Sequence, residues 1–394
     1  MDGRHRRSIR FFCLGIALYW AALYVYVPIL SVYARSMKAS LSLVGLIVAS
    51  YGVVQFVLRI PLGVVSDRLG KRMPFVLAGF VTVAISCLGL ALSPSPGFLL
   101  VFRGMAGLAA CSWVTSSVLF ASYFPPQQAV RASSLVNFFS SGGRVLSTAL
   151  GGVLAQRFGW VSTFWAGAIL GVAGMAVMAQ AREDTATAVR RFTWRDLARI
   201  GRVPLLALVS ILGALVQYSS YATTYGFIPV YAAGLGASKA DLGWLTVAMQ
   251  IPYTLMALAA GRVTDRIGER MTVVGAALLG AAATLAAPFI HSLNLLILSR
   301  VADGMGQGLI YATLMGLSIR AVPPSERASA MGIFQAVYAL GMFGGPAISG
   351  VIADHWGLGV MFLVTGVVSI GMAVVAWWGL RASVLASRLG EAKG

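Results

Sequence analysis

The chain has 394 residues, of which 58% are hydrophobic and only 11% are charged, and its formal net charge is +18. No water-soluble globular domain needs so apolar a balance, so the composition excludes a soluble protein. A membrane-spanning helix takes about 20 apolar residues, which leaves room here for roughly a dozen spans. The cysteines, Cys13, Cys87 and Cys111, all fall in apolar segments, and neither a disulfide framework nor a metal site is expected.

Apolar runs separated by polar breaks predict the helices. In the first half these lie near 11–34, 41–66, 73–93, 98–123, 132–155 and 161–180. In the second half they lie near 204–232, 240–262, 272–290, 295–320, 328–353 and 359–380. The predicted domains are an N-terminal six-helix bundle at 1–180, a basic cytoplasmic linker at 181–203 and a C-terminal six-helix bundle at 204–394. The predicted fold is an all-α integral membrane protein with 12 transmembrane helices in two pseudo-symmetric bundles.

A short charged stretch occurs twice, each time between two predicted helices. The first copy runs Gly63-Val-Val-Ser-Asp67-Arg68-Leu-Gly70-Lys71-Arg72. The second runs Gly261-Arg-Val-Thr-Asp265-Arg266-Ile-Gly268-Glu269-Arg270. In such a tight turn Gly63 lets the helices approach closely, and Gly70 allows the positive-φ backbone of a chain reversal. The chain is therefore a duplication.

The repeated pattern Gly-x-x-x-Asp-Arg-x-Gly-x-Arg resembles the signature loop of the major facilitator superfamily, and the resemblance covers essentially the whole chain. It implies two six-helix halves that rock about one central site near the middle of the bilayer. It also implies that the two loops latch the cytoplasmic side when the site opens outward. That role would fall on Gly63, Asp67, Arg68, Gly70, Arg72, Gly261, Asp265, Arg266, Gly268 and Arg270.

Basic residues gather in alternate turns, and this asymmetry predicts the orientation of the chain. With the N-terminus placed in the cytoplasm, that side receives most of the arginines outside the spans. The opposite side receives only Arg35, Lys38, Arg157 and Lys239. The positive charge therefore indicates topology and not a nucleic-acid partner. The sequence predicts a multi-pass protein of the plasma (bacterial inner) membrane, in contact with the lipid bilayer, with both termini cytoplasmic.

Few charged residues fall inside the predicted spans and away from their ends: Arg59, Arg103, Arg144, Arg300 and Asp303. Each costs about 2.5–3.5 kcal/mol at a helix centre on insertion scales, so each needs a partner or water. Arg144 lies about 13 residues into its helix, roughly 20 Å deep at 1.5 Å per residue. The first-half spans contain no acidic residue, so its partner is Asp303, backbone carbonyls, water or an anionic substrate.

Asp303 is the one carboxylate away from the ends of a predicted span, since Asp241 stands at the very start of its span, and this makes Asp303 the first candidate for a protonatable group. It follows Arg300 by three residues on nearly the same helical face, so a structural ion pair is the alternative. Arg300-x-x-x-Gly304 repeats Arg103-x-x-x-Gly107 of the first half. The resemblance implies that Arg103 and Arg300 assist proton movement. The other interpretation is that they bind backbone carbonyls and hold helices together.

Aromatic residues one helical turn apart predict a substrate-binding face on two helices that line the cavity in the superfamily. These residues are Trp20 and Tyr24 in the first half and Tyr221 and Tyr225 in the second. Helix packing and interfacial anchoring are the alternatives. Arg144 joins them as a substrate-binding candidate, and further polar candidates within the spans are Gln55, Asn137, Gln250 and Gln335.

The sequence therefore predicts a monomeric secondary transporter of a small organic solute, without cofactor, metal or enzymatic activity. Proton-coupled efflux of a drug or metabolite is the first expectation. Against it, the helix near 132–155 lacks the proline of the superfamily's antiporter motif, whereas the helix near 328–353 carries Gly345-Pro346. The alternative is a symporter or uniporter of an organic anion or sugar-like solute, which Arg144 favours. A lipid translocase and a membrane sensor are further alternatives.

Overall fold

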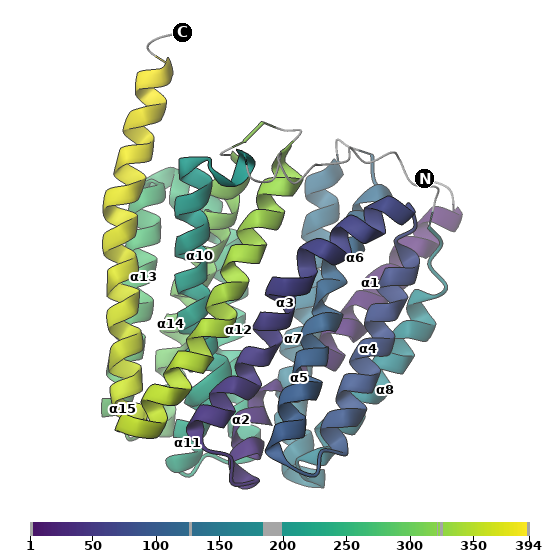
Figure 1. Cartoon of the computed structure of the whole chain (residues 1–394), viewed down its shortest axis with the longest axis vertical. Coiled ribbons are helices and arrows are strands. Elements are labelled where there is room, and N and C mark those ends of the chain that lie inside the picture. The colour runs from purple at the N-terminus through teal and green to yellow at the C-terminus, as the bar shows by residue number, and fades with distance from the viewer. Residues whose placement is uncertain (1–2, 126–127, 184–198, 321, 324–325, 392–394) are drawn as a thin grey trace. The chain divides into compact units, whose positions relative to one another are not determined.

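A computed structural model describes residues 3–125, 128–183, 199–320, 322–323 and 326–391 (Figure 1). It does not describe the side chains at 3–5, 64, 67–68, 129–131, 328 and 382–391. Throughout the described part, the regular structure is helical. Most of the predicted linker, residues 184–198, lies outside the described residues, so the predicted domain boundaries stay predictions.

The described part of the first half contains eight helices, α1 to α8, where six spans are predicted, because two of the predicted spans are each divided into two helices. Their bounds are α1 Gly3–Tyr24, α2 Val27–Ser36, α3 Leu41–Leu69, α4 Met73–Ala91, α5 Pro96–Cys111, α6 Trp113–Ser122, α7 Ala129–Phe158 and α8 Val161–Met178. Pro28 lies in the first turn of α2, where a missing N–H costs nothing, so the helix restarts there. The second break, at Ser112, separates α5 from α6.

The second half also departs from simple helices at two places. Its elements are α10 Pro204–Ala222, a π-helix Thr223–Phe227, α11 Ile228–Gly234, α12 Lys239–Ile267, α13 Glu269–Ala286, a 3-10 turn Ala287–Phe289, α14 Leu293–Arg320 and α15 Arg327–Glu391. The long α15 covers both of the last two predicted spans. Gly357 separates them, since its φ of 85° lies outside the helical region.

Two of the predicted spans, α7 and α14, are less apolar than the others. Nine helices in the described part are long and apolar enough to cross a membrane, and one of these, Ser329–Arg381, contains two predicted spans. Neither α7 nor α14 is among the nine. Arg144 lies on α7, and Asp303 lies on α14. With Ser329–Arg381 counted as two spans, and with α7 and α14 added, the described helices account for the 12 predicted spans, and the all-α membrane fold is confirmed. The two spans that are not among the nine hold the main candidate residues.

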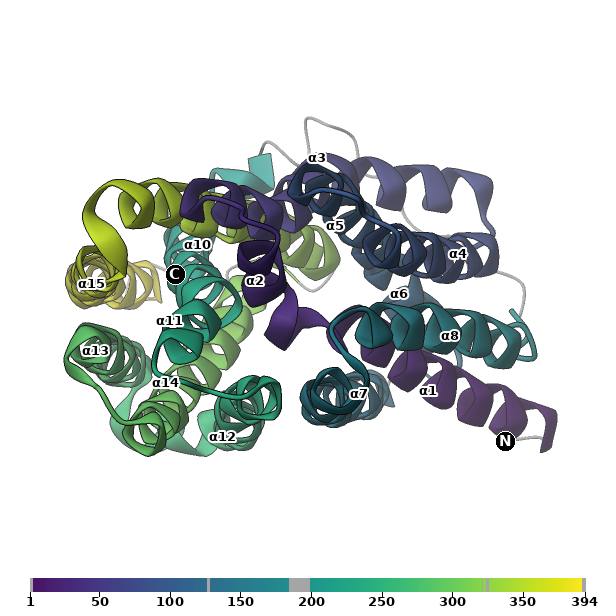
Figure 2. The ribbon, with the colours of Figure 1, turned by 90° about the horizontal axis from the view of Figure 1, so that it is seen from below.

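Contacts between helices divide the chain into two compact units. Unit 1 contains residues 1–191 and 236–247, and unit 2 contains residues 192–235 and 248–394. In unit 1, α1 packs on α7 and α8, α4 on α8, and α3 on α5. In unit 2, α15 packs on α10 and α13, and α13 also packs on α14 (Figure 2). Each unit therefore has its own set of packed helices.

Candidate functional site

Three predicted substrate-binding residues, Arg144, Trp20 and Tyr24, come together in unit 1. Arg144 is a half-buried residue of α7, and its Cζ lies 5.1 Å from the Trp20 ring centroid and 5.6 Å from that of Tyr24, both on α1. The two rings have their centroids 5.7 Å apart. Arg144 Nη2 also donates a hydrogen bond to Ser141 Oγ at 3.1 Å. A guanidinium within about 6 Å of a ring centroid is a cation–π contact, so two rings stabilise this charge.

Glycines of α7 bring this helix close enough to α1 for those contacts. Gly143, next to Arg144, lies against the backbone of Ala17, and Gly151 lies against the backbone of Val25. A Cβ added at Gly143 would be 3.0 Å from the Ala17 carbonyl carbon and nearer still to its oxygen. Small residues of this kind let membrane helices approach backbone to backbone. The sequence of α7 thus places the guanidinium over the rings of α1.

Neighbouring rings also fix Trp20. Its ring lies edge-on to Trp113, at 5.4 Å between centroids, and to Tyr19, at 6.1 Å. The hydroxyl of Tyr19 is itself anchored, because it donates to the Ala109 carbonyl oxygen. Trp20 is buried, yet its Nε1–H has no hydrogen-bond partner among the described residues. An unpaired buried donor costs about 1–3 kcal/mol, so a ligand with acceptor oxygens would satisfy it.

A second arginine cluster of unit 1 surrounds Arg103 on α5. Its Cζ lies 4.2 Å from the ring centroid of Tyr51 and 5.5 Å from that of Tyr26, and its Nη1 donates to the Tyr26 hydroxyl at 2.8 Å. Gly107, one turn further along α5, packs on the Tyr51 backbone, where an added Cβ would lie 3.0 Å from the Tyr51 Cα. Aromatic side chains therefore stabilise this buried charge as well.

Gln55, another predicted substrate-binding residue, belongs to a separate contact on α3. Its Oε1 accepts a hydrogen bond from Arg59 Nη2 at 2.8 Å, and its Nε2 donates to the Tyr51 carbonyl oxygen at 3.3 Å. Both Gln55 and Arg59 are buried. The structure thus brings Gln55 to Arg59 and not to the Arg144 cluster.

The predicted proton-coupling residues Asp303 and Arg300 lie in unit 2 and form an ion pair. Asp303 is 1% exposed, and its Oδ2 lies 3.2 Å from Arg300 Nη1. The same oxygen accepts hydrogen bonds from Gln307 Nε2 at 2.9 Å and Thr224 Oγ1 at 3.4 Å. Arg300 Nη2 also donates to the Ala283 carbonyl oxygen at 3.2 Å. Any proton taken up by Asp303 therefore has to compete with a formed ion pair.

Sequence reasoning missed two of these partners. Gln307 follows Asp303 by one helical turn, so the i,i+4 spacing could have indicated it. Thr224 comes from a different helix and carried no such signal. It lies in the π-helix Thr223–Phe227, next to the predicted residues Tyr221 and Tyr225, whose ring centroids are 4.9 Å apart. Short π-helices interrupt α-helices most often at functional sites.

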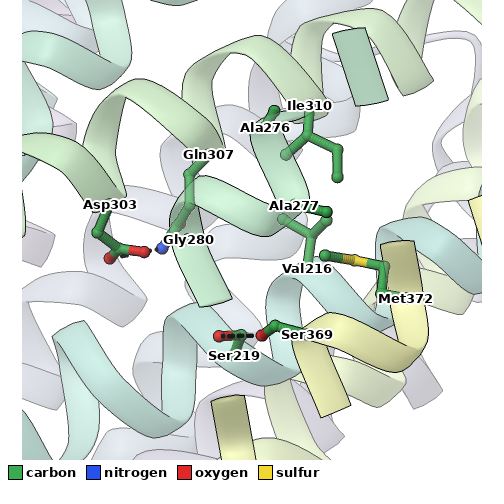
Figure 3. A pocket seen from close by; sticks show the side chains of 10 residues that line it. All are labelled: Val216, Ser219, Ala276, Ala277, Gly280, Asp303, Gln307, Ile310, Ser369 and Met372. Carbon is green, nitrogen blue, oxygen red and sulfur yellow. Dashed lines mark hydrogen bonds between the residues drawn. The ribbon is translucent and has the colours of Figure 1, made fainter. Parts of the chain in front are cut away.

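A small cavity lies beside Asp303 and is lined by residues of unit 2 (Figure 3). About 20 Å³ of it is open to the centre of a water molecule, which is room for about one water. Four polar side chains contribute to its wall: Asp303 and Gln307 from α14, Ser219 from α10 and Ser369 from α15. Ser369 Oγ donates to Ser219 Oγ at 3.2 Å. The other lining residues are Val216, Ala276, Ala277, Gly280, Ile310 and Met372.

The remaining polar candidates are scattered. Asn137 is exposed on α7, and its Nδ2 donates to the Ser133 carbonyl oxygen of its own helix at 2.8 Å. Gln250 is buried on α12, and its Nε2 donates no hydrogen bond to a described residue. Gln335 is half-buried on α15. Asn137, in the same unit as Arg144, has no recorded contact with the Arg144 cluster among the described residues, whereas Gln250 and Gln335 belong to unit 2 and their predicted role stays a prediction.

The first latch loop has the predicted backbone turn and an unpredicted carboxylate. Gly70 caps the end of α3 with φ of 65°, which confirms the left-handed conformation expected there. The backbone N–H groups of Arg72 and Met73, at the start of α4, donate to the two carboxylate oxygens of Glu183 at 2.7 and 2.9 Å. The side chains of the predicted latch residues Asp67 and Arg68 lie outside the described residues.

The second loop has its own contacts. Gly268 has φ of 81° between α12 and α13. Arg270 Cζ lies 3.3 Å from the centroid of the Trp377 ring. Asp265 and Arg266 are exposed. The sequence predicts a close approach of helices at Gly63, but a Cβ added there would make only an ordinary van der Waals contact. At Gly261, its counterpart in the second loop, an added Cβ would meet open space.

Neither unit shows a metal centre within its described residues, where no group of three or more His, Cys, Asp or Glu side chains gathers. What the described residues offer instead is a stabilised cation with an unpaired indole N–H in unit 1, and a buried ion pair beside a small polar cavity in unit 2. The first suits binding of an anion, and the second suits a proton.

Comparison with known proteins gives consistent matches along the chain. The family model described as Major Facilitator Superfamily matches residues 12–225 and 210–393. An uncharacterised transporter of that type from Methanocaldococcus jannaschii is 22% identical over 364 residues, 89% of this chain and 92% of the relative. A probable nitrate/nitrite transporter of Mycobacterium tuberculosis is 27% identical over 341 residues, 83% and 84% of the two chains.

The fold is likewise similar to solved structures. A bacterial homolog of the human lysosomal transporter Spinster, in an inward-facing and unoccupied conformation, gives a TM-score of 0.82 at 16% identity. The match covers 97% of this chain and 98% of the other. At this identity the likeness concerns the fold.

Proposed function

Because the chain belongs to the major facilitator superfamily, and is thus a multi-pass membrane transporter, we propose that it moves a small organic anion and that Arg144 binds this anion. One observation carries the proposal. The Arg144 cation is held over the rings of Trp20 and Tyr24, in a half whose predicted spans contain no carboxylate. Ring contacts do not neutralise a guanidinium, so its positive charge would attract an anionic ligand.

The chemistry of a guanidinium fits this role. Its flat face contacts an aromatic ring, while its N–H donors point outward in the plane, where a carboxylate accepts two of them. Such charge-assisted bonds are about twice as strong as neutral ones. The unpaired Nε1–H of Trp20 supplies a further donor. An aromatic or short-chain carboxylate would satisfy both groups at once.

The nitrate/nitrite relative supports an anionic substrate. That protein aligns over 83% of this chain and is described as a probable transporter of nitrate and nitrite, which are small anions. The same arrangement of cation and donors that suits a carboxylate would suit such an ion. We therefore include nitrate among the ligands to test.

We further propose that transport is driven by protons through Asp303, with Arg300 as its partner and Arg103 as a second arginine of the coupling system. The carboxylate is the one acidic group away from the ends of the predicted spans, and its ion pair is buried. Protonation would release Arg300 and change the contacts of α14. This gives a physical link between a proton and the helices of unit 2.

Proton-coupled efflux of a drug or metabolite is the second candidate. The ring pairs Trp20 with Tyr24 and Tyr221 with Tyr225 favour it, because aromatic faces bind large apolar solutes without fixing their charge. In this case Arg144 would have a structural or gating role. Ligand charge therefore distinguishes the two candidates.

We also propose, from the charge asymmetry of the turns, that the protein lies in the plasma membrane with both termini cytoplasmic. The repeated loops would then close the cytoplasmic side, and a single chain would suffice for transport. The predicted boundaries at residues 180 and 204 would mark the ends of the two rocking halves.

The test is thermal unfolding of the purified protein with aromatic carboxylates, nitrate, cationic drugs, sugars or lysolipids. A ligand at 100 times its Kd stabilises the folded state by about 2.7 kcal/mol. We expect stabilisation by anions that disappears in Arg144→Ala and persists in Arg157→Ala, a control at an exposed arginine of the same helix. Stabilisation by cationic drugs that survives Arg144→Ala would replace this proposal with the second candidate.

A further inference from the structure

The two carboxylate oxygens of Asp303 have different surroundings. Oδ2 accepts from three donors, on Arg300, Gln307 and Thr224. Oδ1 accepts no hydrogen bond from a described residue. It lies on the side of Gly280, where an added Cβ would be 3.6 Å away. Both residues line the cavity (Figure 3), and Asp303 as a whole is 1% exposed, so the cavity is the space next to this oxygen.

Two other groups of the cavity wall complement Oδ1. A carboxylate oxygen can only accept, so Gln307 has to turn its amide nitrogen to Asp303, and its Oε1 then remains as an acceptor without a described donor. The one hydroxyl hydrogen of Ser369 has two acceptors, Ser219 Oγ at 3.2 Å and the Thr365 carbonyl oxygen at 3.1 Å. Ser219 Oγ is in neither arrangement the donor, so its own hydroxyl hydrogen is left to donate into the cavity. The wall therefore offers two acceptors and one donor, all from buried residues.

Two acceptors and one donor are the hydrogen-bond partners that one water molecule needs. A water donates twice and accepts at least once, and buried waters make about three hydrogen bonds. We propose that the cavity is a specific water site and that its water exchanges the proton with Asp303, an inference that rests on the proposed role of Asp303 in proton coupling. A hydronium ion formed there from solvent protons transfers one proton to Oδ1 and remains as water. The reverse step returns the proton.

The surrounding charges allow this step. Arg300 is the one charged side chain that contacts Asp303 among the described residues, and α10, α13 and α15 contribute only uncharged residues to the cavity wall. When Asp303 is neutral, Arg300 keeps the Ala283 carbonyl oxygen and Ser299 Oγ as acceptors. A metal cation fits less well, because Arg300 already balances the carboxylate and hard cations take six or more oxygen ligands.

The glycine at 280 provides a direct test. Gly280→Ala would place a methyl group at ordinary van der Waals distance from Oδ1, so it should fill the water's space without a clash. Gly275→Ala is the matched control on α13, because nothing lies within 4 Å of its added Cβ. Both are compared in proteoliposomes for uptake driven by a pH gradient and for substrate exchange at equal pH.

We expect Gly280→Ala to slow gradient-driven uptake by about tenfold or more, as for loss of a positioned proton-transfer group, while exchange stays near the wild-type rate. Gly275→Ala should match the wild type in both assays. Ser219→Ala should reproduce the selective defect and Ser219→Thr, which keeps the hydroxyl, should restore it. This rescue would identify Ser219 as a positioning residue.

Asp303→Asn distinguishes a wrong water site from a wrong assignment of proton coupling to Asp303. If Asp303→Asn abolishes gradient dependence while Gly280→Ala and Ser219→Ala behave as wild type, the water site is wrong and the role of Asp303 stands. If Asp303→Asn leaves gradient dependence unchanged, the proposed proton coupling through Asp303 falls and the water site with it. Equal loss of uptake and exchange in Gly280→Ala would also refute the inference, since damage would then be structural.

Discussion

Replacing Gly143 by alanine should weaken anion binding although Arg144 itself is retained. The added Cβ would lie 3.0 Å from the Ala17 carbonyl carbon and 3.1 Å from its Cα, and these backbone atoms cannot rotate away. Overpacking of this kind costs about 1–3 kcal/mol, and at about 1.4 kcal/mol per factor of ten this is roughly 5- to 150-fold in the unfolding equilibrium. Relief requires α7 to move from α1, which carries the guanidinium away from the Trp20 and Tyr24 rings.

The neighbouring glycine supplies the control. Nothing lies within 4 Å of a Cβ added at Gly142, so Gly142→Ala makes the same chemical change one position earlier on α7. We would measure unfolding in detergent and, by calorimetry, the Kd of an anion that stabilises the wild type. Gly143→Ala should be destabilised and bind more weakly, and Gly142→Ala should resemble the wild type. Equal effects of both substitutions would refute the argument that close packing of α1 and α7 builds the site.

Three further changes test other contacts. Glu183→Ala removes the acceptor of the Arg72 and Met73 N–H groups, so unfolding should become easier by about 0.5–2 kcal/mol, as for loss of a helix cap; an unchanged melting curve would show that water replaces it. Arg103→Lys loses the flat contact with Tyr51, and a double-mutant cycle with Tyr51→Leu should give a coupling of about 0.5–2 kcal/mol, whereas zero coupling would exclude the contact. Asp67→Asn should lower turnover in proteoliposomes while insertion stays intact, and normal turnover would remove the latch assignment.

The helices were predictable because a span must bury its backbone hydrogen bonds, which demands long apolar runs. Most predicted ends lie within a few residues of the observed ones. The breaks at Val25–Tyr26 and Ser112 were not predicted, since a short interruption leaves hydropathy almost unchanged. Proline at 28 could have indicated the first of them, whereas Ser112 carries no comparable signal.

The Arg144 cluster was also within reach of the sequence. Trp20 and Tyr24 share a helical face by their spacing, and a mid-membrane arginine demands a partner. That these rings are the partner depends on glycine packing between α1 and α7, which only the structure shows. The predicted link between Arg144 and Asp303 would join the two units, so it stays a prediction.

The surroundings of Asp303 show what sequence alone does not reach. Spacing on one helix indicates Arg300, and could have indicated Gln307. The Thr224 contact depends on the π-helix Thr223–Phe227, a register change without a residue pattern in this chain. The cavity depends on residues of four helices, α10, α13, α14 and α15, that lie up to about 150 positions apart in the sequence, as Ser219 and Ser369 do. Pairs across helices are set by packing, and one sequence does not contain them.

The most direct test of the anion proposal is uptake of a radiolabelled aromatic carboxylate by proteoliposomes that contain wild type, Arg144→Ala or Arg144→Lys, beside a labelled organic dication. The account predicts carboxylate uptake by the wild type, its loss in Arg144→Ala and partial retention in Arg144→Lys, which keeps the charge but loses the planar N–H donors. Dication uptake that is equal in all three proteins, with no carboxylate uptake in any, would contradict the account and make Arg144 a structural residue.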